Sequence, residues 1–345
     1  MLRREFLQSS FGALASTAMA TWAVRAESTV AARTDSTRRL LYVLSEFTHT
    51  DKAAMQSAVE AVGASSFNVL ILSFLQVAVA NEKLSLTFNG NAFSSFASEV
   101  PAMLTRLRSG FGARKRILLS IGGWASAPSF AAIRSFGVAR FVRQLTEEII
   151  VPLGLDGIDL DVEPTKGGLD QWIAVQREYG RTLVEITNEY KRLHPTHVVT
   201  HAPISAVAAE IYAKRTLLPE LKNSLLEATR TQHGNNIDWL NVQFYEGGVV
   251  EGGDIADYYC KRLVGPLAEM REQTGITQAL SFFTPTFEPA AKQSLEFCQQ
   301  TVAAINLRCA DLHAGKVSGV AIWDYAQIAS SIGDWSRGLV AALHS

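Results

Sequence analysis

Three acidic side chains alternate along one short segment of the chain. Residues 155–164 read LDGIDLDVEP, so Asp159, Asp161 and Glu163 share one parity and the residues between them are apolar. Because side chains of one parity lie on the same face of a strand, the segment predicts a β-strand with one acidic and one apolar face. Buried carboxylates that lie close together repel one another and lose hydration, so at least one should have a raised pKa. A carboxyl group of raised pKa can act as a general acid, and Glu163, the last of the row, is the predicted acid.

Two other interpretations of this segment are weaker. An exposed strand would mix Lys, Thr and Ser with its acids, whereas these three positions are all carboxylates. Clustered carboxylates attract divalent cations, but ligands two residues apart on a rigid strand diverge from a single ion, and no nearby histidine or second acidic strand completes a coordination shell. We therefore expect no metal ion and no other cofactor. Asp156 has the opposite parity, and we expect it to hold the start of the strand.

Polar and aromatic residues on two later segments could complete such a site. In the segment WLNVQFY, Gln243 and Tyr245 share a parity, which predicts that Tyr245 faces the same rim as Glu163. Trp323 follows two small residues of its own parity, which leaves room for a sugar to stack on the indole. Packing in the core is the alternative for this tryptophan.

The segment SIGGW, residues 120–124, is a further candidate. Its glycines, Gly122 among them, permit a close approach of the backbone, and Ser120 can hydrogen-bond to the acidic row. Trp124 could equally line a cleft or cap a helix. His201, in the segment THAP, could contact a substrate, but a structural histidine is the favoured interpretation.

The rest of the chain repeats a short apolar run followed by a longer amphipathic stretch, which is typical of a (β/α)₈ barrel. An open doubly wound sheet would need a glycine-rich turn after the first strand, and residues 44–49, LSEFTH, contain no glycine. No linker divides the body, so we expect a single domain. Strands are expected at 40–47, 67–77, 116–124, 157–163, 198–205, 239–245, 279–284 and 319–325. Helices are expected at 53–62, 100–109, 138–150, 171–193, 257–274, 290–312 and 335–343.

Four of these motifs resemble those of glycoside hydrolase family 18, the chitinases and endo-β-N-acetylglucosaminidases. Residues 156–163, DGIDLDVE, match the family's DGxDxDxE signature, and SIGGW matches its SxGG element. QFY at 243–245 matches its tyrosine motif, and Trp323 falls where its last strand has a tryptophan. The resemblance spans residues 120–323 in the family's order.

The resemblance implies cleavage of β-1,4 linkages in N-acetylglucosamine polymers by substrate-assisted catalysis. Glu163 would protonate the glycosidic oxygen while the substrate's 2-acetamido carbonyl attacks the anomeric carbon to give an oxazolinium ion. Asp161 would hold the acetamide N–H, Asp159 would share a proton with Asp161, and Tyr245 would donate to the attacking carbonyl. The residues implied to bind the sugar are Trp323, Gln243, Ser120, Trp124, Gly122 and Glu246.

Two features bear on the choice of substrate. Glu246 departs from the Asp or Asn that many family members have after the tyrosine. The interval 284–319 has room for a helix but not for the α+β insertion of some chitinases, so the groove should be open and should favour internal cleavage. Two alternatives stay open: an endo-β-N-acetylglucosaminidase acting on N-glycans, and a catalytically silent glycan-binding protein. The silent proteins usually lack the acid, which is present here.

The N-terminus is typical of a bacterial twin-arginine export signal. Arg3 and Arg4 precede Phe-Leu and an uncharged stretch, 9–24, which is shorter than the roughly 20 residues of a membrane-spanning helix. We expect a signal peptide at 1–26, a leader at 27–37 and the catalytic barrel at 38–345. The protein should therefore be periplasmic or secreted, without a stable membrane anchor.

Charge and cysteine content exclude several classes of partner. The 345 residues include 32 Lys and Arg against 33 Asp and Glu, a net charge of −1, so no basic field favours nucleic acid or anionic membranes. Cys260, Cys298 and Cys309 contain no CxxC spacing, which argues against a zinc module or a redox motif and allows at most one disulfide. We expect a monomer whose partner is a polysaccharide or glycan containing N-acetylglucosamine.

Overall fold

The computed structural model describes residues 37–43, 52–80, 83–89, 91–92, 100–109, 115–165, 168–213, 236–245, 255–266, 283–310 and 317–344. Residues Arg38–Ser345 form one compact unit, and the elements below belong to it. The expected signal peptide at 1–26, the leader up to residue 36 and Glu246 lie outside the described residues.

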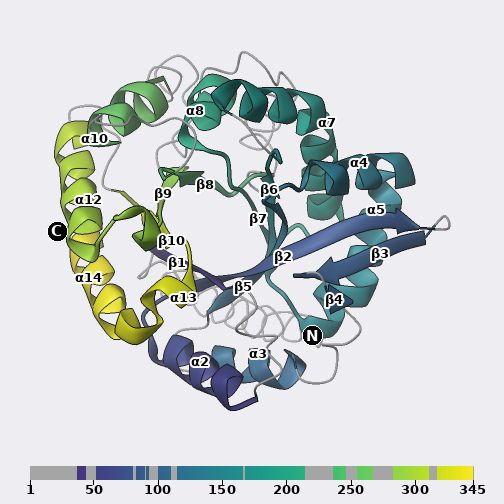
Figure 1. Cartoon of the computed structure of the whole chain (residues 1–345), viewed down its shortest axis with the longest axis horizontal. Helices are drawn as coiled ribbons and strands as arrows, with labels where there is room; N and C mark the ends of the chain where they lie inside the picture. The colour runs from purple at the N-terminus through teal and green to yellow at the C-terminus, as the bar shows by residue number, and fades with distance from the viewer. Residues whose placement is uncertain are drawn as a thin grey trace, which may run out of the picture. The chain divides into compact units, whose positions relative to one another are not determined.

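Eight parallel strands in the described part of the chain close into a barrel (Figure 1). Their spatial order is β1, β10, β9, β8, β7, β6, β5 and β2, and β1 pairs with both β10 and β2, which closes the ring. The predicted (β/α)₈ barrel is confirmed. The strands are β1 (Arg38–Val43), β2 (Val69–Ala80), β5 (Arg116–Gly123), β6 (Gly157–Val162), β7 (Val198–His201), β8 (Trp239–Gln243), β9 (Phe283–Phe287) and β10 (Gly319–Ile322).

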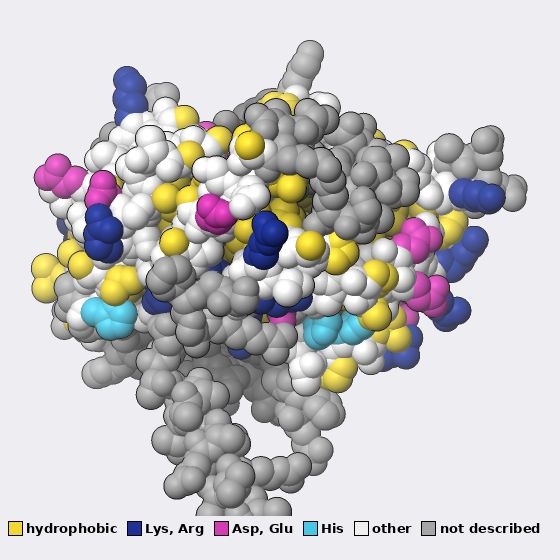
Figure 2. Space-filling model, turned by 90° about the horizontal axis from the view of Figure 1, so that it is seen from below, with side chains coloured by type: hydrophobic (Ala, Val, Ile, Leu, Met, Phe, Trp, Pro, Cys, Tyr) yellow, Lys and Arg dark blue, Asp and Glu magenta, His cyan; other side chains and the backbone are white. Residues whose placement is uncertain are grey.

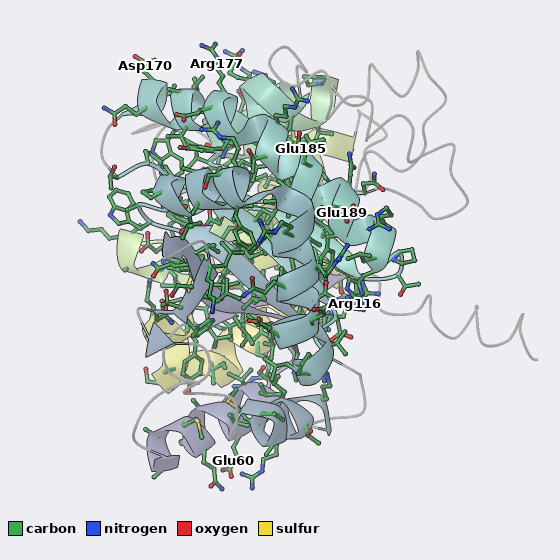
Figure 3. The ribbon with its side chains drawn as sticks, turned by 90° about the vertical axis from the view of Figure 1, so that its right-hand side faces the viewer. Glu60, Arg116, Asp170, Arg177, Glu185 and Glu189 are labelled. Carbon is green, nitrogen blue, oxygen red and sulfur yellow. A yellow bond between two sulfur atoms is a disulfide. The ribbon has the colours of Figure 1, made fainter. Side chains whose placement is uncertain are left out.

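Helices surround this ring (Figure 1). In α7 (Leu169–Leu193), Asp170, Arg177 and Glu185 are exposed (Figure 3), whereas Trp172 and Ile186 of the same helix are buried. The other helices of the described residues are α2 (Lys52–Ala64), α3 (Val100–Ser109), α4 (Ala127–Phe136), α5 (Val138–Leu145), α6 (Val151–Leu153), α8 (Ser205–Val207), α10 (Ile255–Tyr258), α12 (Leu295–Cys309), α13 (Tyr325–Ile328) and α14 (Ile332–His344). Helical turns η3 (Thr146–Ile150), η4 (Ala208–Ala213) and η5 (Tyr259–Val264) continue α5, α8 and α10.

The structure differs from the sequence prediction in three elements. The seventh barrel strand, β9, runs past residue 284 and through Pro285, where we expected it to end, and pairs with β8. Helix α4 was not predicted. An antiparallel hairpin is also new: β2 extends beyond the barrel and pairs with β3 (Lys83–Phe88), which pairs with β4 (Asn91–Ala92).

Alternation along the strands separates two apolar regions. The larger lies between the strands and the helices and includes Leu41, Leu70 and Ile158. The smaller lies inside the barrel. It contains Leu40, Tyr42, Val69, Ile71, Leu118, Val198, Trp239 and Ala321, with Trp323 packed against it. Inside the barrel, this apolar layer is therefore followed, toward the carboxyl end of β6, by the acidic row.

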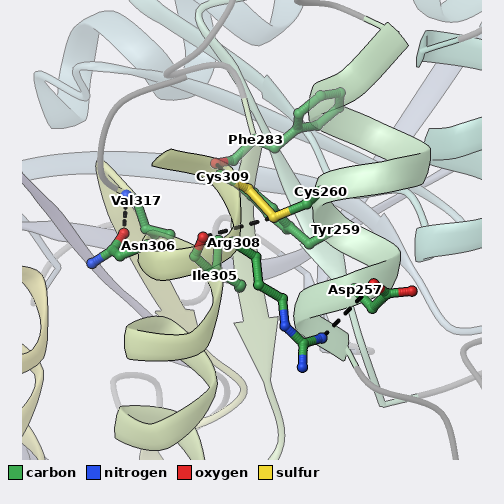
Figure 4. The surroundings of a disulfide bond; sticks show 9 residues. All are labelled: Asp257, Tyr259, Cys260, Phe283, Ile305, Asn306, Arg308, Cys309 and Val317. Carbon is green, nitrogen blue, oxygen red and sulfur yellow. Dashed lines mark hydrogen bonds and ion pairs between the residues drawn. A yellow bond between two sulfur atoms is a disulfide. The ribbon is translucent and has the colours of Figure 1, made fainter. Parts of the chain in front are cut away.

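A disulfide joins two outer elements of the barrel. Cys260 of η5 is bonded to Cys309 of α12 (Figure 4), and Cys298 is a buried free thiol. Nearby, the Arg308 guanidinium lies 3.9 Å from Asp257, a second link between the same segments.

On the face shown in Figure 2, neither acidic nor basic side chains dominate, and the two kinds are interspersed. No described helix combines the length and the hydropathy that crossing a bilayer requires.

Candidate active site

Strand register brings polar side chains from neighbouring strands to the level of Asp159. On one side Ser120 of β5 pairs with Asp159 of β6, and on the other side Thr200 of β7 does so. All residues of β6 are buried, as are Ser120 and Thr200. The acidic face predicted for this strand therefore points into the barrel.

Asp159 accepts hydrogen bonds from four side chains. Its carboxylate accepts hydrogen bonds from Ser120 Oγ at 2.8 Å, Thr200 Oγ1 at 2.5 Å, Asn241 Nδ2 at 3.1 Å and Tyr42 Oη at 3.4 Å. Burial raises the pKa of Asp159 to about 6, and these four donors oppose the rise. The four hydrogen-bond donors thus stabilise the ionised form of Asp159 against the effect of burial.

Asp161 and Glu163 follow Asp159 on the same inward face, toward the carboxyl end of β6, and contact each other. Burial, the charges of Glu163 and Asp159, and a hydrogen bond with Glu163 raise the pKa of Asp161 well above its ordinary value. Gln243 Nε2 lies 3.3 Å from Asp161 Oδ1 and 3.5 Å from Glu163 Oε1, and donates to the carbonyl of Ala202 at 2.9 Å. The raised pKa that the sequence predicted for the row is therefore found at Asp161, where burial and the neighbouring carboxyl groups favour the protonated form.

The main chain of Glu163 is fixed from the loop after β5. Its N–H donates to Ser126 Oγ at 3.0 Å, and the Ser126 hydroxyl donates to the carbonyl of Asp161 at 3.0 Å. The N–H of Ala127, the first residue of α4, donates to the carbonyl of Glu163 at 3.3 Å. Ser126 was not among the predicted site residues, although it lies two residues after the SIGGW motif.

The two glycines of SIGGW allow close packing against the site. Gly122 has φ +125°, and a Cβ there would lie 1.8 Å from the carbonyl oxygen of Asp161. Gly123 has φ +84°, and a Cβ there would lie 2.4 Å from the ring of Phe74. The predicted close approach of the backbone is present, and at Gly122 it is made to the acidic strand itself.

Aromatic rings lie beside the acidic row. The ring of Trp323, which is half-buried, stacks on Phe74 with centroids 5.3 Å apart and meets the edge of Tyr42 at 5.4 Å. The peptide bonds Ser73–Phe74 and Trp323–Asp324 are cis. Phe74 and Tyr42 were missed because they lie in apolar strands, where nothing in the sequence distinguishes a ring at the site from one in the core.

The remaining predicted residues lie at the carboxyl ends of their strands. Tyr245 is half-buried, two residues past β8, and its phenol is among the groups that raise the pKa of Tyr42. Trp124 follows β5 directly and is 57% exposed.

Two other polar residues have structural roles, as the sequence favoured. His201 is buried between Thr187 Oγ1 and Tyr212 Oη, each at 2.9 Å, and burial lowers its pKa to about 3. Asp156 accepts a hydrogen bond from the N–H of Ile117 at 3.0 Å, which ties the start of β6 to β5. No group of three or more His, Cys, Asp or Glu within the described ranges could hold a metal ion.

Comparison with known proteins identifies the family. The family model described as glycosyl hydrolases family 18 matches residues 38–284. No curated protein sequence matches the chain. A family 18 chitinase from Pseudoalteromonas aurantia has a similar structure, with a TM-score of 0.60 and 15% identity over 89% of this chain and 100% of that chain.

Two further solved structures share the fold. A family 18 chitinase from Cycas revoluta in complex with (GlcNAc)₄ aligns with a TM-score of 0.54 and 13% identity over 88% of this chain and 99% of that chain. A xylanase and amylase inhibitor protein aligns with a TM-score of 0.52 and 16% identity over 89% of this chain and 98% of that chain. At these identities the likeness concerns the fold alone.

Proposed function

Because this chain belongs to family 18 of the glycosyl hydrolases, we propose that it cleaves β-1,4 linkages between N-acetylglucosamine units with retention of configuration. The observation that supports this most directly is the buried contact between Asp161 and Glu163 at the carboxyl end of β6, which raises the pKa of Asp161 and lets the two carboxyl groups share one proton. A carboxyl group kept protonated by burial and a neighbouring charge is suited to general acid catalysis near neutral pH.

In the proposed reaction, Glu163 passes the shared proton to the glycosidic oxygen as the bond to the leaving sugar breaks. The 2-acetamido carbonyl oxygen of the substrate attacks the anomeric carbon and forms an oxazolinium ion. Asp161, now ionised, accepts a hydrogen bond from the acetamide N–H, and Tyr245 donates to the attacking oxygen. Water then attacks the anomeric carbon as its bond to the acetamido oxygen breaks, which restores the 2-acetamido group, and Glu163 takes up a proton from the water.

The sugar-binding roles are proposed from position. Trp323 lies against Phe74 at the end of β10 and offers an aromatic surface for a pyranose ring. Gln243 already touches both carboxyl groups of the pair, so it can orient them toward the acetamide. Trp124, highly exposed beside the site, is suited to stack on a more distant sugar, and Glu246 is proposed to contact the sugar next to Tyr245.

We propose internal cleavage of the polymer and action as a monomer. Between β9 and β10, the described residues 288–310 contain helical elements and no strand, which supports a groove without the added wall of some chitinases.

The deciding experiment compares Glu163→Gln with the unsubstituted protein on chito-oligosaccharides and on a high-mannose glycopeptide, with products identified by mass spectrometry. Loss of the acid should reduce turnover by about 10² to 10⁴ while binding of the oligosaccharide is kept. Near-unchanged turnover in the variant would refute the assignment of Glu163. Cleavage of the glycopeptide alone would instead indicate an endo-β-N-acetylglucosaminidase, and binding without hydrolysis a silent lectin-like protein.

We also propose that the protein is exported by the twin-arginine route. Arg3 and Arg4 support this, and so does the bond between Cys260 and Cys309, because disulfides persist mainly in oxidising compartments. Replacing both arginines by lysine should retain the protein in the cytoplasmic fraction. Unchanged export of that variant would contradict the proposal.

A further inference from the structure

A buried series of hydrogen bonds runs from the amino-terminal end of the barrel strands, here called the base of the barrel, to Asp159. The indole N–H of Trp239 donates to Oδ1 of Asn241 at 2.9 Å. Nδ2 of Asn241 donates in turn to Oδ1 of Asp159 at 3.1 Å and to the hydroxyl of Thr200 at 3.3 Å. All four side chains are buried, so their polar groups depend on one another for partners.

Trp239 determines which way the amide of Asn241 points. An indole N–H can only donate, so it must face the amide oxygen, and the other side of the amide must then present its nitrogen. That nitrogen meets Asp159 as a donor. It also donates to the Thr200 hydroxyl, which directs its own hydrogen to Asp159 at 2.5 Å. One donor at the base therefore sets the polarity of two contacts with the carboxylate.

The ring of Trp239 is itself held in place at the base. The guanidinium carbon of Arg38 lies 4.7 Å from the ring centroid. That guanidinium donates to Thr284 Oγ1 at 3.2 Å and to Ser318 Oγ at 2.9 Å. Arg38 lies at the start of β1, and its two acceptors lie near the start of β9 and just before β10. The guanidinium that covers the indole is therefore itself held by two neighbouring segments.

We propose that Trp239 is a positioning residue for hydrolysis. Through Asn241 it keeps a donor on Asp159, and the ionised Asp159 favours a proton on the pair formed by Asp161 and Glu163. Trp239 is the first residue of β8, whereas Glu163 follows the last residue of β6, so we assign Trp239 no contact with the sugar. The kinetic consequence rests on the proposed function, whereas the effect on Asp159 does not.

The direction of the effect follows from the groups around Asp159. The titratable groups that face it are Tyr42 from β1 and Asp161 from its own strand, with Glu163 beyond. Arg38 lies at the base. β5, β7 and β8 face it with side chains that do not titrate, namely Ser120, Thr200 and Asn241. Loss of the amide donor should raise the pKa of Asp159 above its present value of about 6, so Asp159 becomes neutral over more of the acid range.

The kinetic test is Trp239→Phe in the full chain, which keeps an aromatic ring beside the Arg38 guanidinium and removes the indole N–H. The acid-side pKa of kcat on a chito-oligosaccharide should rise by about one unit, which lowers kcat roughly tenfold near pH 5 and less than about twofold near pH 8, with KM unchanged. Trp335→Phe is the matched control, because Trp335 is buried in α14 and takes no part in the hydrogen bonds between Trp239 and Asp159. This control should leave the pH dependence of kcat unchanged. An unchanged acid limb, or a uniform fall at every pH, would overturn the proposal.

A second measurement does not depend on hydrolysis. With isotope-labelled aspartate carboxyl carbons, the magnetic resonance signal of Asp159, identified by its absence in Asp159→Asn, should titrate about one pH unit higher in Trp239→Phe. If the protein hydrolyses none of the substrates, the proposed function is refuted, but the same shift in the titration of Asp159 would still support the effect of Trp239 on that carboxylate. An identical titration would overturn the positioning role. If Trp239→Phe fails to fold, Asn241→Leu removes the donor itself and carries the same expected and overturning results.

Discussion

Ser126, in the loop between β5 and α4, accepts a hydrogen bond from the main-chain N–H of Glu163. We expect Ser126→Ala to lower both stability and turnover. The substitution removes the acceptor of the Glu163 N–H and the donor to the Asp161 carbonyl, both at 3.0 Å and both buried. A buried donor left without a partner costs about 1 to 3 kcal/mol, and the second lost hydrogen bond adds about 1 kcal/mol. The free energy of unfolding should therefore fall by about 2 to 4 kcal/mol.

Turnover should fall further than stability alone explains, because Ser126 fixes where the carboxyl of Glu163 lies. A displacement on the order of 1 Å at a reacting group can reduce the rate about 10²-fold. Urea unfolding and kcat on chito-oligosaccharides measure the two effects. Ser135→Ala is the matched control, since its hydroxyl is exposed on α4 and bonds only within that helix. Equal unfolding free energy and equal kcat in Ser126→Ala and Ser135→Ala would refute the reasoning.

Three further outcomes follow from single features of the structure. Trp323→Ala should raise KM for chito-oligosaccharides about tenfold through lost stacking, and an unchanged KM would remove Trp323 from the binding surface. Cys309→Ser should lower the free energy of unfolding by about 4 kcal/mol, because the disulfide with Cys260 spans 49 residues; a reductant should then destabilise the unsubstituted protein but not the variant. Burial raises the pKa of Asp159 to about 6, so the native state binds this proton more tightly than the unfolded chain. The stability it contributes is present below about pH 4 and is lost as the pH rises to about 6. Relative to Asp159→Asn, the unfolding free energy should fall by roughly 3 kcal/mol over that range, and parallel pH profiles in urea unfolding would contradict this.

The barrel could be predicted because short apolar runs typical of strands alternate along the sequence with longer amphipathic stretches typical of helices. The hairpin formed by β2 and β3 was missed because it interrupts that repeat, although KLSLTF alternates as a strand should. Its buried residues, Leu84, Leu86 and Phe88, have the parity expected for one covered face. Helix α4 was missed because only three residues separate it from the end of β5, where a longer loop was expected.

The candidate site could be predicted only where its residues are consecutive in the chain. Parity placed Asp159, Asp161 and Glu163 on one face without reference to any other strand. The donors on Asp159 come from β1, β5, β7 and β8, and which of their residues stand at its level depends on barrel register. Thr200 illustrates this: it reaches Asp159 because β7 pairs with β6 in this register, and a shift by one residue would present Val199 instead.

Donor supply, rather than position in the sequence, divides the roles of the three acids. Asp159 receives hydrogen bonds from four side chains, whereas the described donor to Asp161 is Gln243, which also reaches Glu163. Hydrogen bonds to a carboxylate stabilise its charged form, so the negative charge is better supported on Asp159 and the proton is left to the pair above it. Carboxyl groups that are chemically alike and close in sequence thus have surroundings that favour the charged form to different degrees, which is the condition under which one can supply charge and another can supply a proton.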